Sequence, residues 1–429
     1  MASERERLLF APRPKLHLPQ AAATASRSRH LPLLDEVRPI DRRTRPVHCV
    51  WELTLRCDLA CRHCGSRAGH ARPDELSTEE ALDVVGQLAA LGVLEVTLIG
   101  GEAYLHPGWE AVVAAIRAAG MACAMVSGGR GIDRDRAARA ARAGVESLSI
   151  SIDGDEEVHD RLRGVRGAYA SALSALRHGA EAGMQVAVNT QVNRLNMSRL
   201  HRVLDRLLEA GGHGWQLMLT VPAGRAADEP EVQLQPSDLL VLFPTLMELR
   251  ARCEAHDVKL LPGNNVGYFG PYEHALRGGI RSACYADCSA GRSSLGIEAN
   301  GDVKGCPSLP TRNWVGGNLR DHALVDIWER TPELRHMRAR STGELWGYCA
   351  ECYYAETCKG GCTWTAQSFM GRPGNNPYCH HRALEFQARG LRERVVQRTP
   401  AWGEAFDYGV WEIVVEPLEA EEDDATCRR

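Results

Sequence analysis

The sequence lacks the features that mark membrane-spanning and secreted proteins. No stretch of about 18 consecutive apolar residues, the length that a membrane-spanning helix needs, occurs in the 429-residue chain. Near the amino terminus, the apolar run is shorter than the roughly seven residues that the core of a signal peptide requires. We therefore expect a cytoplasmic protein that has no membrane partner.

An excess of charge of one sign is also missing. The chain has 51 Lys and Arg residues against 55 Asp and Glu residues, and its formal net charge is −4. Nucleic-acid binding usually needs a basic face, so we expect no nucleic-acid partner. Contents of 44% hydrophobic and 25% charged residues are typical of a globular protein, and the length allows two domains.

Strand and helix signals alternate through the first half of the chain. A helix signal beginning at Ser77, with Glu80 completing a capping box, follows the first strand signal. Successive units of this kind predict an α/β fold with a parallel sheet, either a partial barrel or a doubly wound sheet, with ligands at the carboxyl ends of the strands. The expected strands are residues 48–56, 93–101, 121–127, 145–154, 184–192 and 214–222.

The second half of the chain has a different composition. It is short of long helices and rich in Gly, Pro and Cys, so it looks unable to bury a large core without metal sites. Asn300–Gly301, between two alternating runs, predicts a hairpin. The expected organisation is a disordered arm at 1–45, the α/β domain at 46–235, a connecting helix and linker at 236–265, the cysteine-rich domain at 266–390, and a C-terminal helix with an acidic tail at 391–429.

Cysteine is the most informative residue type, with 15 copies. Structural disulfides are rare in the reducing cytosol, so clustered cysteines there indicate metal ligands. Cys57, Cys61 and Cys64 form a C-x3-C-x2-C motif directly after the first strand. Thiolates favour iron and zinc, and three ligands to a four-iron cluster would leave one iron open to react. A zinc knuckle and buried free cysteines are the alternative interpretations.

This motif and its position closely resemble the radical S-adenosylmethionine (SAM) superfamily. The resemblance implies a partial (β/α)6 barrel in which the three cysteines hold a [4Fe–4S] cluster. The open iron of that cluster binds SAM, and reductive cleavage yields a 5′-deoxyadenosyl radical that abstracts hydrogen from a substrate. An electron donor such as a flavodoxin or ferredoxin is the expected partner.

Further positions at strand ends match motifs of this superfamily. Gly100, Gly101 and Glu102 resemble its glycine-glycine-glutamate motif, in which the glycines let the backbone approach SAM and the carboxylate accepts from the SAM ammonium group. Ser127 resembles the serine that contacts the ribose. His63 stands before the third cysteine, where an aromatic residue is usual.

Two arginines are further candidates on the SAM side. Arg163, in a Ser-x-Asp-Gly…His-Asp-x-x-Arg-Gly segment, could pair with the SAM carboxylate, because a guanidinium fork suits that group. A surface salt bridge with Asp160 or Glu157 is the alternative. Arg225 is a weaker candidate, and Asp153 of the same segment could hold a turn.

The second cysteine group resembles the SPASM domain, an iron–sulfur extension of radical SAM enzymes. Eight thiolates make two four-cysteine sites, with zinc as the alternative metal. The resemblance implies two auxiliary [4Fe–4S] clusters with an electron-transfer role, and therefore three clusters in all. Their expected ligands are Cys284, Cys288, Cys306 and Cys362 for one cluster, and Cys349, Cys352, Cys358 and Cys379 for the other.

The resemblance favours a peptide or protein as the substrate, as in the maturation of ribosomal peptides. A small-molecule dehydrogenase and a sulfatase-maturase-like oxidase are alternatives. The second is disfavoured because Pro307 and Ser308, and not an aspartate base, follow Cys306. A non-catalytic iron–sulfur or zinc scaffold is the alternative of another class. The sequence does not identify a general base.

Overall fold

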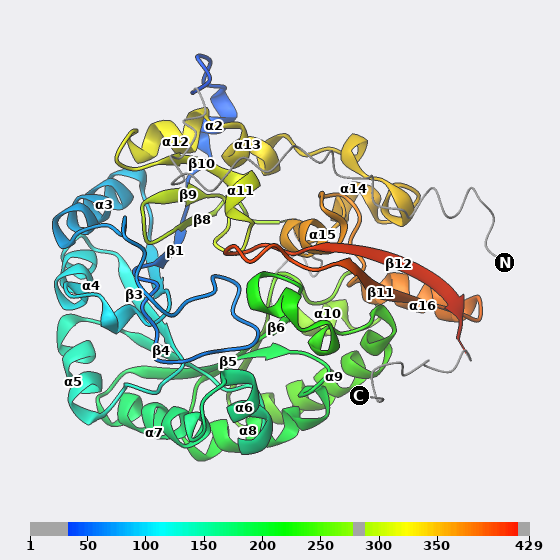
Figure 1. Ribbon diagram of the computed structural model, residues 1–429, viewed down its shortest axis with the longest axis horizontal. Coiled ribbons are helices and arrows are strands. Elements are labelled where there is room, and N and C mark those ends of the chain that lie inside the picture. Colours follow the sequence, from blue (N-terminus) through cyan, green and yellow to red (C-terminus); the bar gives the residue numbers. More distant parts are fainter. Residues whose placement is uncertain (1–32, 278–287, 419–429) are drawn as a thin grey trace.

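The computed structural model of the protein describes residues 33–277 and 288–418 (Figure 1). Within these ranges, no helix is both long and apolar enough to cross a membrane. Seven parallel strands lie side by side in the order of the sequence. They are β1 (His48–Glu52), β2 (Glu95–Ile99), β3 (Ala122–Ser127), β4 (Ser147–Ser151), β5 (Gln185–Val192), β6 (Gly214–Leu219) and β7 (Lys259–Pro262).

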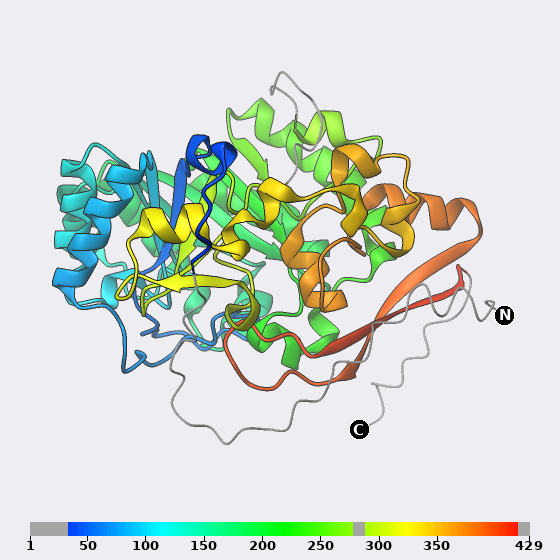
Figure 2. The ribbon, with the colours of Figure 1, turned by 90° about the horizontal axis from the view of Figure 1, so that it is seen from above.

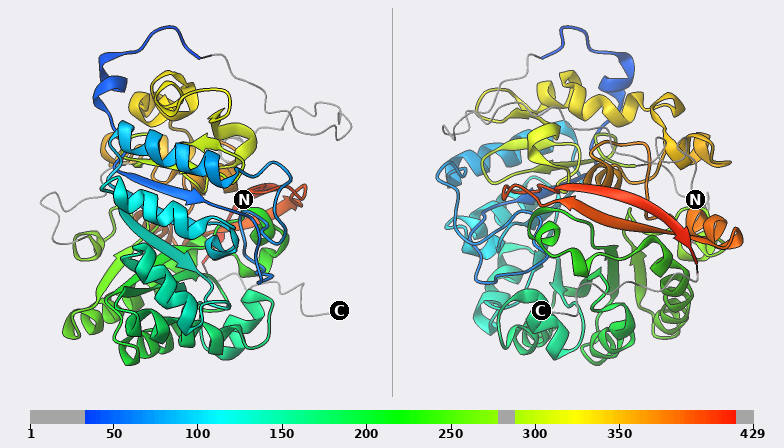
Figure 3. Two further views of the ribbon diagram at one scale, coloured as in Figure 1. Left: turned by 90° about the vertical axis from the view of Figure 1, so that its left-hand side faces the viewer. Right: turned by 45° about the vertical axis from the view of Figure 1, so that its right-hand side comes forward.

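Helices cover the outer side of this curved sheet, which forms a partial barrel (Figures 1 and 3). The predicted α/β fold and the six predicted strands are therefore confirmed. Strand β7 is an addition, and it lies in the segment predicted to be a linker; it pairs with β6, whose edge would otherwise be open. The covering helices are α3 (Thr78–Leu91), α4 (Trp109–Ala118), α5 (Arg134–Ala143), α7 (Ala168–Glu181), α8 (Leu200–Glu209) and α9 (Leu239–Ala255).

Local sequence signals explain how these units begin and end. Ser77 caps α3, because its hydroxyl accepts from the Glu80 amide at 3.2 Å and the Glu80 carboxylate accepts from the Ser77 amide at 2.8 Å. Gly92 ends the helix with φ +91°, a left-handed conformation that suits glycine. Leu98, Leu148 and Val188 are fully buried among the apolar side chains of the core. The polar residues that serve the site therefore lie at the carboxyl ends of the strands.

Part of the cysteine-rich region extends the barrel sheet beyond β1. Strand β8 (Ser294–Ile297) pairs parallel with β1, and β9 (Asp302–Lys304) and β10 (Val315–Asn318) follow in antiparallel order. The predicted hairpin at Asn300–Gly301 therefore joins β8 to β9. This pairing satisfies the edge of β1 and brings the segment after Cys306 to the barrel interior.

Short helices follow β10 and lie beside the barrel (Figure 2), and Cys349, Cys352, Cys358, Cys362 and Cys379 lie within or between them. These helices are α12 (Leu324–Arg330), α13 (Pro332–Ala339), α14 (Ala355–Cys358), α15 (Thr363–Met370) and α16 (His380–Ala388). A fully buried ion pair with N–O distance 2.6 Å joins Arg382 of α16 to Glu393. The carboxylate uses both oxygens, so the pair fixes α16 firmly against the segment that follows it.

The expected helix after residue 390 is wrong. Strands β11 (Leu391–Thr399) and β12 (Val410–Pro417) form an antiparallel hairpin that crosses the front of the barrel (Figure 1). Both segments are rich in β-branched residues in partial alternation, and Gly390, with φ +69°, separates them from α16. The acidic run of the expected tail, Glu419 to Asp424, lies outside the described residues.

The expected disorder of the amino-terminal arm is also wrong for residues 33–45. Helix α2 (Pro39–Arg43) carries Asp41, which is fully buried and pairs with Arg38, Arg335 and Arg338 at 2.8–3.2 Å. Such a network ties the arm to α13, because an unpaired buried carboxylate would be costly. Residues 1–32 lie outside the described residues.

Candidate functional site

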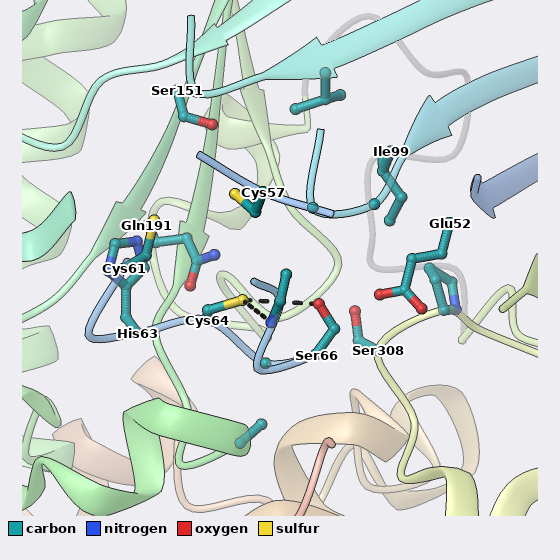
Figure 4. Close-up of a pocket in the computed structure, with 18 of the residues that line it drawn as sticks. Glu52, Cys57, Cys61, His63, Cys64, Ser66, Ile99, Ser151, Gln191 and Ser308 are labelled. Atoms are coloured by element: carbon teal, nitrogen blue, oxygen red, sulfur yellow. Dashed lines mark hydrogen bonds between the residues drawn. The ribbon is translucent and has the colours of Figure 1, made fainter. Parts of the chain in front are cut away.

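The three cysteines that follow β1 line one cavity of about 230 Å³ (Figure 4). Their loop is fixed at both ends by the backbone: the Cys57 amide donates to Gly69 at 3.1 Å, and the Ala60 amide donates to Arg163 at 3.1 Å. The structure therefore brings Cys57, Cys61 and Cys64 together at the carboxyl end of β1, where the fold class places ligands.

Burial disfavours ionisation of two thiols in this loop. Burial and the nearby Glu102 carboxyl raise the pKa of Cys57 to about 12. Burial also raises the pKa of Cys61. A bound cation reverses this effect, because a coordinating thiol is deprotonated. Three thiols from one short loop that line one cavity suit a [4Fe–4S] cluster with an open iron.

Gly100 and Gly101 allow the loop after β2 to pass against the loop after β1. A Cβ atom on Gly100 would lie 2.2 Å from the Thr54 oxygen, and one on Gly101 would lie 2.1 Å from the Arg56 oxygen. Both contacts are with the backbone, which cannot move aside cheaply. The glycines line the cavity as expected, but their first physical requirement is this loop–loop contact rather than an approach to SAM.

Glu102 and Ser127 meet at the ends of β2 and β3. The Ser127 hydroxyl donates to Glu102 at 2.6 Å, and the Gly128 amide donates to the same carboxyl group at 2.7 Å. Burial raises the pKa of Glu102 to about 7, although these two hydrogen bonds oppose the shift. The two residues that the sequence assigns to the SAM ammonium group and ribose are thus adjacent in the cavity wall.

Arg163 lines the cavity, but its partner is neither Asp160 nor Glu157. Its guanidinium group lies 2.6 Å from the Asp153 carboxylate and 3.7 Å from the Cys61 sulfur. Asp160 instead accepts from backbone amides at 2.6 and 2.8 Å. The Arg163 side chain is therefore already engaged on both sides, by an anion and by a candidate iron ligand.

Asp153 is the centre of this buried network. It is fully buried, and His63 Nε2 lies 3.2 Å from Oδ2, the same oxygen that Arg163 contacts. Burial alone would raise the pKa of Asp153, but Arg163 and His63 outweigh it and hold the pKa well below its usual value. The Asp153 carboxylate also accepts from the Gln191 amide at 3.0 Å, so it joins the ends of β4 and β5.

Arg225 contacts the backbone of the cysteine loop, whereas Arg163 contacts the Cys61 sulfur. Its Nε atom donates to the Cys61 carbonyl at 2.6 Å, and its Nη atoms donate to the Ala68 carbonyl at 3.1 Å. These bonds to backbone oxygens position the loop, and they leave Arg225 in the lining of the cavity.

Sequence reasoning missed several residues that line the same cavity. Glu52 belongs to β1 itself, Glu298 follows β8, and Phe406 comes from the loop between β11 and β12. Glu52 had a detectable signal, because a carboxylate inside an apolar strand pattern is unusual. Phe406 had none, since its hairpin was expected to be a helix.

The described auxiliary cysteines lie in two groups. A second, small cavity of about 20 Å³ is lined by Cys349, Cys352, Cys358 and Cys379. Cys306 and Cys362 each interact electrostatically with Cys288, which places these three thiols near one another. Cys284, the expected fourth ligand of that group, lies outside the described residues. The thiols that are present fit iron–sulfur sites by their chemistry.

Fold and site together define a partial α/β barrel with cysteine-lined sites for a cofactor, joined to a cysteine-rich domain. Comparison with known proteins identifies the family. A model of the radical SAM superfamily matches residues 51–219, and a model of an iron–sulfur cluster-binding domain matches residues 288–353. The chain belongs to the radical SAM superfamily and carries a SPASM domain.

Relatives with different activities resemble the chain over most of its length. Mycofactocin maturase MftC of Mycobacterium ulcerans is 32% identical over 78% of this chain and 88% of the relative. The AdoMet-dependent heme synthase of Nitratidesulfovibrio vulgaris is 28% identical over 77% of this chain and 91% of the relative. These relatives support a radical SAM enzyme, and they divide between two kinds of substrate.

Solved structures share the fold at low sequence identity. Streptococcus suis SuiB bound to S-adenosylmethionine has a TM-score of 0.60 at 16% identity, over 78% of this chain and 76% of that protein. The anSMEcpe protein with bound AdoMet has a TM-score of 0.63 at 15% identity, over 79% of this chain and 95% of that protein.

Proposed function

We propose that this radical SAM enzyme modifies a peptide or protein, and that it does so with three [4Fe–4S] clusters and SAM. The cluster at the open site supplies electron transfer to SAM and so a radical that abstracts hydrogen. The proposed ligands of this first cluster are Cys57, Cys61 and Cys64. The proposed auxiliary ligands are Cys284, Cys288, Cys306 and Cys362, and Cys349, Cys352, Cys358 and Cys379.

The chain's own residues would position SAM and exclude water. Glu102 and Ser127 offer a buried carboxyl group and a hydroxyl group at one wall of the cavity, which suits an ammonium group and a ribose. Gly100 and Gly101 keep the backbone there free of side chains. A flavodoxin or ferredoxin would serve as the electron donor.

One observation favours a peptide over a tetrapyrrole: the charges that line the cavity. Haem and its precursors carry carboxylates, which need cationic partners when they are buried. Among the described lining residues, Arg163 is paired with Asp153, and Arg225 donates to carbonyls. Glu52 and Glu298 add two acidic groups, and Arg72 and Lys304, the cations beside them, are already paired with Glu298. A neutral peptide segment suits such a wall better than a polycarboxylate does, and the MftC relative supports the same class of substrate.

Anaerobic reconstitution followed by turnover tests this proposal. The reduced protein is incubated with SAM and the synthetic peptide encoded by the short reading frame nearest to its gene, and in parallel with an iron-containing tetrapyrrole. We expect 5′-deoxyadenosine and a mass change in the peptide only. Conversion of the tetrapyrrole without conversion of the peptide would overturn the assignment of substrate, and zinc in place of iron would overturn the clusters.

A further inference from the structure

Glu52 places a buried carboxyl group in the cavity, and the residues proposed to contact SAM form no hydrogen bond with it. It is the last residue of β1, it is 4% exposed, and it lines the cavity. No described residue forms a hydrogen bond with its buried Oε2 atom. A buried, unpaired acceptor is costly, so such an atom in a cavity indicates a missing partner.

Figure 4 shows where this carboxyl group lies. It turns toward Ser66 and Ser308, on the side of the view opposite Cys61 and His63. Ser308 is two residues from Cys306, one of the proposed auxiliary ligands. A group that contacts Glu52 would therefore lie between the three-cysteine loop and the segment of an auxiliary site.

We propose that Glu52 is a substrate-binding residue that accepts a hydrogen bond from a neutral N–H or O–H group of the peptide. The inference rests on the proposed peptide-modifying function, and it names the chemistry that the substrate presents at this wall. Held there, the peptide would have one polar group fixed while a neighbouring C–H bond faces the SAM side of the cavity.

The surrounding charges explain why the partner is neutral. Glu298, 2% exposed, pairs with Lys304 at 2.7 Å and with Arg72 at 2.8 Å. These two cations and the two carboxylates sum to zero when Glu52 is ionised. A cationic substrate group would leave one positive charge in excess in a buried place, whereas a neutral donor leaves the balance unchanged.

The pKa values agree with different roles for Glu298 and Glu52. Burial and the Glu298 carboxylate raise the pKa of Glu52 to about 7, although Arg72, Lys304 and the Ser66 hydroxyl oppose the shift. Burial alone would raise the pKa of Glu298, but Lys304 and Arg72 lower it to about 2. Glu298 is thus a permanently ionised partner of the two cations, while Glu52 retains an acceptor for a ligand.

The experiment measures kcat and KM for the peptide that the wild-type enzyme modifies, with Glu52→Gln and Glu52→Asp as the variants. Glu52→Gln removes the charge at constant size, and Glu52→Asp withdraws the carboxylate from the substrate. A hydrogen bond to a charged group corresponds to roughly a 10- to 100-fold change in affinity, so we expect KM to rise by about that factor and kcat to fall less. Glu254→Gln, at the exposed end of α9, is the matched control.

Modified peptides identify the donor. N-methylation of each backbone amide in turn, and replacement of each hydroxyl side chain by its hydrogen analogue, removes one donor at a time. One of these peptides should raise KM for the wild-type enzyme and have a smaller effect with Glu52→Gln, because the neutral amide oxygen of Gln forms a weaker bond to the same donor. Iron content and the visible spectrum of the variants check that they have folded.

The outcomes separate this inference from the function on which it rests. If the wild-type enzyme leaves the peptide unmodified, the proposed function fails and the inference fails with it. If the wild-type enzyme modifies the peptide and Glu52→Gln has an unchanged KM, only the subsite is overturned. Additive effects of Glu52→Gln and of every modified peptide would also overturn it.

Discussion

The guanidinium group of Arg163 joins the carboxylate of Asp153, at 2.6 Å, to the sulfur of Cys61, at 3.7 Å. Arg163 is 8% exposed and Asp153 is fully buried, so water screens neither of them well. The ion pair therefore holds a fixed positive charge beside one ligand of the proposed reactive cluster. This geometry places the Arg163 guanidinium group beside a proposed cluster ligand, and its contact with the SAM carboxylate stays a prediction.

A positive charge and a hydrogen bond at a ligand sulfur make a cluster easier to reduce. We therefore expect Arg163→Gln to shift the reduction potential of the SAM-responsive cluster to more negative values. A tenfold change in the reduction equilibrium corresponds to about 59 mV for one electron, and we expect a shift of this order. Potentiometric titration followed by electron paramagnetic resonance measures it. Arg161→Gln, exposed on the same helix, should keep the wild-type potential.

The sequence predicts those parts of the site that lie within a few residues of a recognisable strand. The cysteine loop and the glycine-glycine-glutamate segment each follow a strand whose apolar pattern is complete within a few residues. The partner of Arg163 could not be found in that way. Asp160 and Glu157 were expected as its partners, but Asp153 precedes the helix, and the turn after β4 brings it back to Arg163.

Local sequence patterns do not predict which distant strands pair with each other. The pairing of β8 with β1 joins segments about 250 residues apart, and no periodicity in either strand specifies its partner. The placement of Phe406 against Gly65 depends in the same way on a hairpin that crosses the whole barrel. Such contacts follow from the closing of the fold, so they appear only once the fold is known.

The proposed clusters predict the iron content of the protein. Three [4Fe–4S] sites hold about 12 iron atoms per chain. Cys61→Ala and Cys352→Ala should each lower this content by about four, since each removes a ligand from a different site. Cys253→Ala is the control, because Cys253 is fully buried on α9 away from both cavities. Colorimetric iron and sulfide analysis measures the content, and an unchanged content in Cys352→Ala would contradict the ligand assignment.

Two glycine substitutions should have opposite effects on stability. In Gly101→Ala the new Cβ would meet the Arg56 oxygen at 2.1 Å, so we expect a loss of about 1–3 kcal/mol or more in the free energy of unfolding, together with iron loss from the adjacent loop. Gly86→Ala, inside α3 with no atom within 4 Å of the new Cβ, should gain about 0.5–1 kcal/mol. Anaerobic thermal unfolding compares them, and equal effects would contradict the contact.

The raised pKa of Glu52 predicts that this residue lowers the free energy of unfolding at high pH. The pKa is about 7 in the folded protein against 4.5 for an ordinary Glu. Between these values the folded state binds more protons than the unfolded state, so this group lowers the free energy of unfolding as the pH rises through that range. Glu52→Gln lacks this contribution. We expect its melting temperature to exceed that of the wild type at pH 8 by more than at pH 5, and the same difference at both pH values would contradict the shift.

The loop between β11 and β12 should control access of water to the cavity. Phe406 is 9% exposed, lines the cavity and packs under Lys304, whose Nζ lies 4.0 Å from the ring centre. Its amide donates to the Gly65 carbonyl at 2.7 Å, which ties the loop to the segment directly after Cys64. Phe406→Ala would open this wall while the backbone contact persists.

Because a reactive intermediate is protected only while water is excluded, we expect Phe406→Ala to form more 5′-deoxyadenosine per molecule of modified peptide, by several-fold, at an unchanged iron content. Trp402→Ala, 38% exposed in the same loop and absent from the described cavity lining, should keep the wild-type ratio. Quantifying both products by mass spectrometry gives this ratio. Equal ratios in the two variants would show that Phe406 does not seal the cavity, and the hairpin would then act only as a structural cover for the cysteine loop.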